Sequence, residues 1–220
     1  MPEADFYWEF KGEDYPFDPY KKYLIYFKGC YCMPHAGHYN TVKRFTDLIE
    51  DGINIRVMVH QMGSSRRHGV PYNLNRYIFQ KYIDELLPSD RVHLVKYRSG
   101  IHEILNLDFI DDIDTVIYIR GNEDYNVRKT EKKNRYAYQS IIKSLSRKEI
   151  NMDFYYLERP HVHKLSATKF TRSLIKTRRN CKKHGCDCKY RKLRYFLPDG
   201  LERDVSMKII RKLQRCKLYE

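Results

Sequence analysis

The chain has 220 residues, 42% of them hydrophobic, and a formal net charge of +14. This length fits one large domain, or one domain with additions, and the apolar share is enough for a substantial core. The sequence has no run of about 18 apolar residues, which argues against a membrane span, and the N-terminus lacks the charged-then-apolar pattern of a signal peptide. We therefore expect a soluble, intracellular (cytoplasmic) protein.

The first 20 residues are rich in aromatic side chains and follow neither the period of a strand nor that of a helix. Pro16 and Pro19 argue against a continuous helix there. We predict an aromatic N-terminal arm over residues 1–20 that packs on the domain or on a partner. A single domain is expected over residues 21–220.

Beyond the arm, strand-like and helix-like patterns alternate along the chain. Strands are predicted at residues 23–27, 53–60, 92–96, 115–119 and 153–157. Helices are predicted at residues 39–50, 74–87, 131–146, 168–177 and 205–217, with a weak helix near 101–107. This alternation is typical of crossover units and a mostly parallel sheet. Such a sheet binds ligands beyond the carboxyl ends of its strands.

The most informative motif is His35-Ala36-Gly37-His38, which follows the first predicted strand and precedes the first predicted helix. Two imidazoles and a positive helix N-terminus can bind one anionic group together, and Gly37 lets the backbone approach closely. The motif suits the phosphates of a nucleoside triphosphate. The structural alternative is a helix cap at His38 and a plain loop residue at His35.

Two signatures occur in order. The segment from Gly29 to His38 resembles the first motif of the HxGH nucleotidyltransferases, a superfamily that includes nicotinamide-mononucleotide and pantetheine-phosphate adenylyltransferases and the cytidylyltransferases of lipid synthesis. Residues 165–172, Leu-Ser-Ala-Thr-Lys-Phe-Thr-Arg, are similar to its Ile-Ser-x-Thr-x-x-Arg signature. Between them, Arg120-Gly121 resembles the Arg-Gly loop of the pantetheine-phosphate enzymes. The resemblance extends from about residue 22 to about residue 215.

The resemblance implies a Rossmann-like α/β nucleotidyltransferase fold, with a mostly parallel five-stranded sheet flanked by helices. By the same resemblance, the catalytic residues that contact the triphosphate are His35, His38 and Arg172. The implied nucleotide-binding residues are Gly29, Tyr31, Gly37, Arg120, Gly121, Ser166 and Thr168. Ser166 and Thr168 would bind phosphate at a helix N-terminus, and a plain helix cap is the alternative for Ser166. Mg²⁺ would accompany the triphosphate, held mainly by phosphates and water, and no residue is predicted as a direct metal ligand.

Two positions depart from the family pattern. Cys32 stands where the family usually has Asp, Asn or Gln, and we interpret it as an inert small residue. Thr171 stands where the signature arginine usually lies, and Arg172 comes one residue later.

Arg76 lies where relatives often have an arginine at the start of the second helix, and a structural or surface role is favoured for it.

We therefore predict a nucleotidyltransferase that transfers AMP from ATP to a phosphorylated small-molecule acceptor and releases pyrophosphate. Positioning and neutralisation of growing negative charge would supply the catalysis. One alternative is a cytidylyltransferase that uses CTP, which is less favoured because the Arg-Thr-x-Gly-Ile-Ser-Thr-Ser form is absent. The other is a catalytically weak nucleotide- or nucleic-acid-binding protein on the same fold. A homo-oligomer is a further option, since relatives often assemble.

Positive charge concentrates between Lys164 and Arg194, where twelve Lys or Arg residues accompany one acid, Asp187. Such a segment attracts polyanions, either the nucleotide or a nucleic acid. A solvated basic face is the plain alternative. Within this segment we predict a basic, Cys- and His-containing insertion at about residues 178–191.

Four residues of that insertion have side chains that bind zinc in other proteins: Cys181, His184, Cys186 and Cys188. Their spacing is not that of a common zinc module. Zinc is therefore the less favoured interpretation, and a reduced cysteine-containing loop is the favoured one.

Overall fold

The computed structural model describes residues 15–29, 31–62, 67–95, 101–121, 138–157, 165–180 and 187–218. Five strands form one parallel sheet in the order β3-β2-β1-β4-β5. Their bounds are β1 Lys22–Gly29, β2 Asn54–Gln61, β3 Val92–Val95, β4 Thr115–Gly121 and β5 Asn151–Leu157. The predicted α/β class and the parallel five-stranded sheet are confirmed. The carboxyl ends of the strands meet at one edge, where ligands bind in sheets of this kind.

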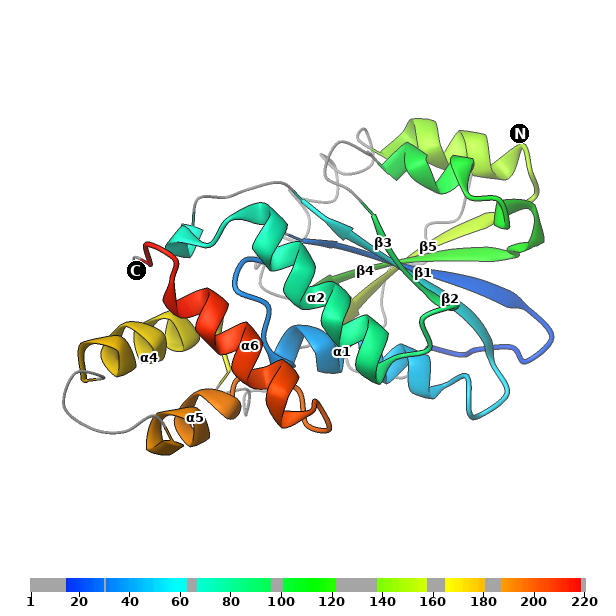
Figure 1. The fold of residues 1–220 in the computed structure, drawn as a ribbon. Coiled ribbons are helices and arrows are strands. Elements are labelled where there is room, and N and C mark those ends of the chain that lie inside the picture. The colour runs from blue at the N-terminus through cyan, green and yellow to red at the C-terminus, as the bar shows by residue number, and fades with distance from the viewer. Residues whose placement is uncertain are drawn as a thin grey trace.

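Helices cover both faces of the sheet (Figure 1). One face is covered by α1 (Ala36–Asp47) and α2 (Tyr72–Leu86). Helices α4 (Ala167–Asn180), α5 (Asp187–Arg194) and α6 (Arg203–Gln214) extend the same core beyond the carboxyl edge of the sheet. The other face packs against helical residues 138–146 and the 3-10 helices η2 (Ile101–Asn106) and η3 (Ile110–Asp112). A further 3-10 turn, η1 (Arg67–Gly69), precedes α2. None of the helices in these described ranges combines the length and apolar composition needed to cross a membrane.

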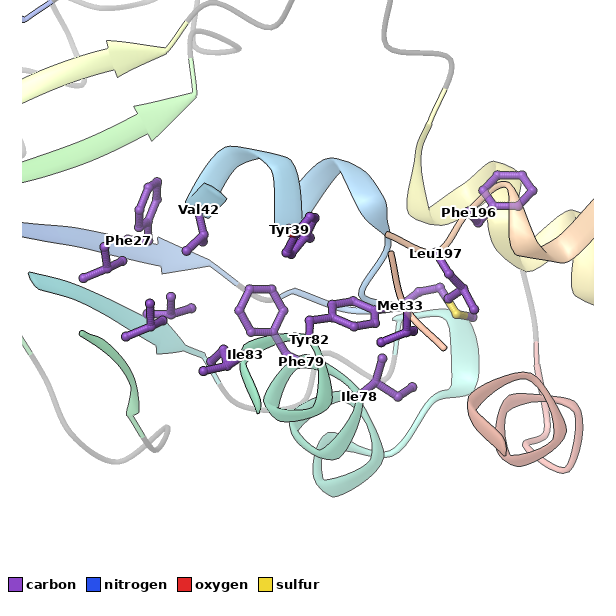
Figure 2. Close-up of a cluster of buried hydrophobic side chains, with 14 of the residues drawn as sticks. Phe27, Met33, Tyr39, Val42, Ile78, Phe79, Tyr82, Ile83, Phe196 and Leu197 are labelled. Atoms are coloured by element: carbon purple, nitrogen blue, oxygen red, sulfur yellow. The ribbon is translucent and has the colours of Figure 1, made fainter. Parts of the chain in front are cut away.

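Strand β1 shows why the sheet needs two helical layers. Tyr23, Ile25 and Phe27 belong to the core beneath α1 and α2, whereas Leu24 and Tyr26 belong to the core on the opposite face. All five side chains are buried. Successive strand residues point to opposite faces, so an uninterrupted apolar run requires cover on both sides. Figure 2 shows the first of these cores, with Phe27 and Val42 at one end and Met33 between α1 and α2.

The N-terminal arm is described only from Tyr15 onward. There the Tyr15 hydroxyl donates to Asp153 Oδ2 at 2.5 Å, and the Tyr15 and Phe17 rings pack edge-on against Tyr23. This part of the arm therefore lies on the domain, as predicted. Burial and the carboxylate of Asp153 raise the pKa of the Tyr15 hydroxyl, which keeps it protonated as the donor.

Three of the differences from the sequence prediction bear on the site. Helix α1 begins at Ala36 rather than at residue 39, because His35 caps it. Strand β4 includes Arg120 and Gly121, predicted to start a loop, because β5 continues to pair with both residues. Helix α5 was not predicted, and it occupies part of the expected insertion. The predicted helix at 131–146 is described only from residue 138, and residues 131–137 lie outside the described ranges.

Candidate active site

The loop between β1 and α1 has an unusual backbone. Tyr31 and Met33 adopt positive φ angles of 41° and 56°, a left-handed conformation that costs a residue with a Cβ about 1 kcal/mol or more. Two side chains of α2 hold the loop in this shape. Asn75 Oδ1 accepts from the Met33 amide at 2.9 Å, and the Tyr82 hydroxyl donates to the Pro34 carbonyl at 3.1 Å. Strain maintained by buried partners is typical of functional loops.

His35 ends this loop and caps α1 with its own side chain. Its backbone is extended, and Nδ1 accepts from the Gly37 amide at 3.1 Å. Because Nδ1 is the acceptor, a neutral His35 ring carries its proton on Nε2. The ring is 6% exposed. His35 is therefore the cap residue, rather than His38 as in the alternative drawn from the sequence.

The cap explains the glycine in the motif. A Cβ on Gly37 would lie 2.9 Å from His35 Cε1 and 3.0 Å from Nδ1, closer than side-chain carbons pack. The His35 ring therefore occupies the space that any other residue at position 37 would need. Space is also limited at Gly29, where a Cβ would lie 3.2 Å from the Tyr31 ring.

The two histidines of the motif lie face to face. The His35 and His38 ring centroids are 4.0 Å apart with planes 26° from parallel. The Tyr31 ring meets His38 edge-on, with 5.2 Å between centroids. Gly29, Tyr31, Gly37 and both histidines thus form one cluster at the carboxyl end of β1. The two residues are three positions apart, so the stack lies at the first turn of α1.

The amides at the start of α1 already have partners within the protein. Ala36 N donates to the Phe196 carbonyl at 2.7 Å, Gly37 N to His35 Nδ1, and His38 N to the His35 carbonyl at 2.9 Å. These three amides are thus satisfied within the protein. The dipole of α1 favours negative charge near its first turn.

The second signature forms the start of α4. Ser166 accepts from Lys169 N at 3.2 Å and is the N-cap residue, as the structural alternative proposed. Among the described residues, nothing accepts from the amides of Ala167 and Thr168. Amides at a helix start that lack an acceptor within the protein can bind an anion. Among the described residues, α4 offers two such amides, whereas the amides of Ala36, Gly37 and His38 in α1 all have acceptors.

The displaced arginine of the signature has a clear structural context. Thr171, at the usual arginine position, is fully buried and donates through Oγ1 to the Ala167 carbonyl at 2.8 Å. An arginine there would have to be buried in the core beneath α4. Arg172, one residue on, is exposed. The one-residue shift therefore places the guanidinium on the outer side of the helix.

The two signatures meet in space. A Cβ on Gly37 would lie 3.9 Å from Leu165 Cβ, so the start of α4 lies against the first turn of α1. Arg120 and Gly121 end β4, the other neighbour of β1. With Ile119 paired to Phe27, the end of β4 reaches the same sheet edge as Gly29. The backbone thus brings every segment predicted for the site to one edge. Nothing is described of the Arg120 side chain.

The segment that follows α5 contacts the start of α1 and helix α4. The guanidinium of Arg194 donates to the carbonyls of Leu197, Pro198 and Leu201, at 3.1, 2.6 and 3.2 Å. These bonds fix the segment whose Phe196 carbonyl accepts from Ala36. The Phe196 ring stacks on Phe170 of α4, with centroids 4.8 Å apart and planes 6° from parallel. Figure 2 shows Phe196 and Leu197 beside the end of the α1–α2 core.

Sequence reasoning missed three residues that hold this site: Asn75, Tyr82 and Arg194. Each bonds a backbone group of a segment that carries or contacts the motif, and Asn75 and Tyr82 are more than forty residues from the loop they hold. Arg76 behaves as the sequence interpretation favoured, since its guanidinium donates to the Leu94 carbonyl and ties α2 to β3. Cys32 is buried, in keeping with an inert residue.

Across the residues that the structure describes, no three His, Cys, Asp or Glu side chains gather closely enough to hold a metal ion. The four residues of the zinc alternative are not among those side chains. Cys181, His184 and Cys186 fall outside the described residues, and nothing is described of the Cys188 side chain. A zinc site there stays the less favoured prediction.

Comparison with known proteins supports the fold. No family model and no curated protein matches the sequence. Among solved structures, a nicotinic acid mononucleotide adenylyltransferase from Plasmodium falciparum, complexed with NaAD, is similar over 88% of this chain and 97% of its own, with a TM-score of 0.51 and 9% identity. An identity this low shows the fold alone. The predicted Rossmann-like α/β fold with a five-stranded parallel sheet is thereby confirmed.

Proposed function

We propose that the protein is a nucleotidyltransferase that transfers AMP from ATP to a phosphorylated small-molecule acceptor and releases pyrophosphate. The observation that carries this proposal is the meeting of two signatures, predicted separately from the sequence, at the starts of α1 and α4. Both starts lie beyond the carboxyl edge of the sheet. The structural relative is an adenylyltransferase bound to a dinucleotide, which supports the choice of ATP.

In this proposal the chain binds and orients the triphosphate. His35 donates from Nε2, because its Nδ1 is committed to the cap bond with Gly37. His38 adds a second imidazole from the stacked pair. The open amides of Ala167 and Thr168 bind phosphate oxygens at the start of α4, and Arg172 contributes a guanidinium that can form two parallel bonds to phosphate.

The chemistry needs no covalent intermediate. A phosphate oxygen of the acceptor attacks the α-phosphorus of ATP, the bond from that phosphorus to the bridging oxygen breaks, and pyrophosphate carries away the electron pair. The donors described above neutralise charge that grows on the phosphoryl oxygens, and they are already in place before the reaction. Holding the acceptor oxygen, the α-phosphorus and the leaving oxygen in line accounts for the rest of the rate enhancement.

Magnesium fits this site as a companion of the nucleotide. The described donors are imidazoles, amides and a guanidinium, which bind phosphate rather than Mg²⁺. Mg²⁺ prefers oxygen ligands and keeps several waters, so triphosphate oxygens and water would hold it. When bound, it would screen the negative charge of the triphosphate.

The two roles of His35 can be separated by substitution. Asn is among the best N-cap residues but has no imidazole, whereas Ala provides neither cap nor donor. We expect His35→Asn to keep the free energy of unfolding near the wild-type value and His35→Ala to lower it by about 1 kcal/mol. Both variants should weaken ATP binding, as should His38→Ala, by about tenfold each.

The measurement is calorimetric titration of ATP, CTP, GTP and UTP in the presence of magnesium. Selective ATP binding that is weaker in His35→Asn would support the proposal. Selective CTP binding would favour the cytidylyltransferase alternative. If no triphosphate binds, or if binding is unchanged in His35→Asn and His38→Ala, the proposed site is refuted.

A further inference from the structure

Positive charge is concentrated in the C-terminal helices. Residues 165–220 contain seventeen Lys or Arg and five Asp or Glu, so they carry twelve of the fourteen net positive charges of the chain. These residues form α4, α5 and α6, which pack against one another beside the carboxyl edge of the sheet (Figure 1). One end of the molecule is therefore strongly basic, and the remainder is close to neutral.

The basic residues are arranged in exposed stripes. On α4 and again along α6, exposed cations recur at intervals of three and four residues, which places them on one face of each helix. These stripes are Lys169, Arg172 and Lys176 on α4, and Lys208, Arg211 and Arg215 along α6. Among residues 165–177 and 190–218, whose side chains the structure describes, the exposed acids lie between Asp199 and Asp204.

These cations differ from those elsewhere in the protein. Across the described residues, neither Lys169 nor Lys176 of α4 forms an ion pair, and the same is true of the three stripe residues of α6. By contrast, Lys43 pairs with Asp47 within α1, and Lys148 with Asp111 on the opposite face of the sheet. The charges of these five residues are thus available to an external anion.

An exposed aromatic side chain follows the cations of α5. Arg191 and Lys192 are exposed, and Tyr195 comes directly after the helix, which ends at Arg194. Tyr195 is 58% exposed. Its ring rests edge-on against Phe196, which stacks on Phe170 in the core. An exposed ring that rests on a buried aromatic side chain and follows exposed cations in the sequence resembles the stacking platforms of single-strand binding proteins.

We propose that the exposed faces of α4, α5 and α6 bind single-stranded nucleic acid, with the cations on its phosphates and Tyr195 stacked on a base. Charge alone would serve any polyanion. The exposed tyrosine favours single strands, because an unpaired base offers an open face for stacking and a duplex does not. Arg172 is the one residue that this inference shares with the proposed nucleotidyl transfer, and the test therefore uses α6 and Tyr195, to which that proposal gives no role.

The test is fluorescence anisotropy with a labelled single-stranded RNA and its DNA equivalent, each about 16 nucleotides long to span one site. The duplex of the same sequence and anionic phosphatidylserine vesicles serve as competing ligands. The α6 variant replaces Lys208, Arg211 and Arg215 together with Gln. The control replaces Lys143, Arg147 and Lys148 with Gln, which removes the same charge from exposed positions on the opposite face of the sheet.

We expect single strands to bind more tightly than the duplex and the vesicles. The α6 variant should lower the slope of log affinity against log salt by about 2, because each lost phosphate contact on a single strand removes about 0.7. The control variant should leave the slope unchanged. Tyr195→Ala should weaken single-strand binding by about fivefold or more, whereas Tyr195→Phe, which keeps the ring, should not.

Several results would overturn the proposal. One is equal weakening by the α6 variant and by the control, since that would mean a non-specific charge effect. Tighter binding of the vesicles or the duplex would assign the surface to another partner. Unchanged affinity in Tyr195→Ala would remove the stacking role, and failure of any single strand to bind at low salt would refute the inference altogether. ATP binding measured on the same α6 variant should remain at the wild-type level, which separates this result from the proposed function.

Discussion

Replacing Gly37 with Ala tests the local argument for the His35 cap. In most helices this exchange stabilises by about 0.5 to 1 kcal/mol, because Gly loses more backbone entropy on folding. Here the new methyl would lie 2.9 Å from His35 Cε1. The ring would have to move away, which would break the Nδ1 bond to the amide of residue 37 and disturb the stack on His38.

The size of the effect follows from these opposing contributions. Loss of a side-chain cap costs about 1 kcal/mol, and up to about 2, whereas the backbone gain is at most about 1. We therefore expect Gly37→Ala to destabilise the wild-type protein by about 0.5 to 1 kcal/mol. In a His35→Ala background nothing obstructs the methyl, and the same exchange should stabilise by about 0.5 kcal/mol. The coupling between the two sites should then be about 1 to 1.5 kcal/mol.

The assay is urea unfolding of the four proteins of this double-mutant cycle, read from the midpoints at constant slope. ATP titration on the same proteins provides a second readout. Gly37→Ala should weaken binding when His35 is present and should have no further effect when it is absent. If Gly37→Ala changes stability by the same amount and sign in both backgrounds, the His35 ring does not explain the glycine and the cap argument is wrong.

Three further predictions concern stability. Arg194→Met removes a guanidinium bonded to three carbonyls and should cost about 2 kcal/mol in urea unfolding, whereas its exposed neighbour Arg191→Met should change stability by less than about 0.5. Tyr82→Phe leaves a loop carbonyl without its donor and should cost about 1 kcal/mol, with weaker ATP binding because the loop loosens. Burial, and then the charge of Arg56, hold the pKa of His93 below its ordinary 6.5. The folded state therefore binds fewer protons, so stability should fall as pH drops below 6.5 towards the folded pKa, and His93→Asn should flatten that fall in unfolding curves between about pH 7 and 5. An unchanged midpoint in either of the first two variants, or an unchanged pH slope in the third, would contradict these assignments.

The fold was accessible from the sequence because its strongest signals are local. The apolar run in β1 leaves no polar face, which predicts a strand covered on both sides. Alternation with helical patterns then predicts parallel strands. The His-x-Gly-His spacing could also be understood locally, since cap, glycine and second imidazole lie within four residues. Order along the chain was enough to place the second signature at the same sheet edge.

What the sequence did not reveal depends on distant contacts. Asn75 and Tyr82 hold a loop more than forty residues away, and nothing in their own neighbourhood marks them for that role. The extension of β4 through Arg120 and Gly121 is caused by pairing with β5, which overrides a local pattern typical of a loop. Helix α5 was hidden because its sequence is dominated by cations, and its packing against α4 and α6 supplies the stability that its composition lacks.

In the proposed function, the stacked histidines and the start of α4 orient ATP so that a phosphate oxygen of the acceptor attacks its α-phosphorus. The most direct measurement is ³¹P NMR of reactions with ATP, magnesium and each of nicotinamide mononucleotide, nicotinate mononucleotide, phosphopantetheine and FMN. We expect one acceptor to give pyrophosphate and an adenylylated product in equal amounts, and His38→Ala to slow the formation of both greatly. Release of orthophosphate with ADP, or no turnover of ATP with any acceptor, would contradict it.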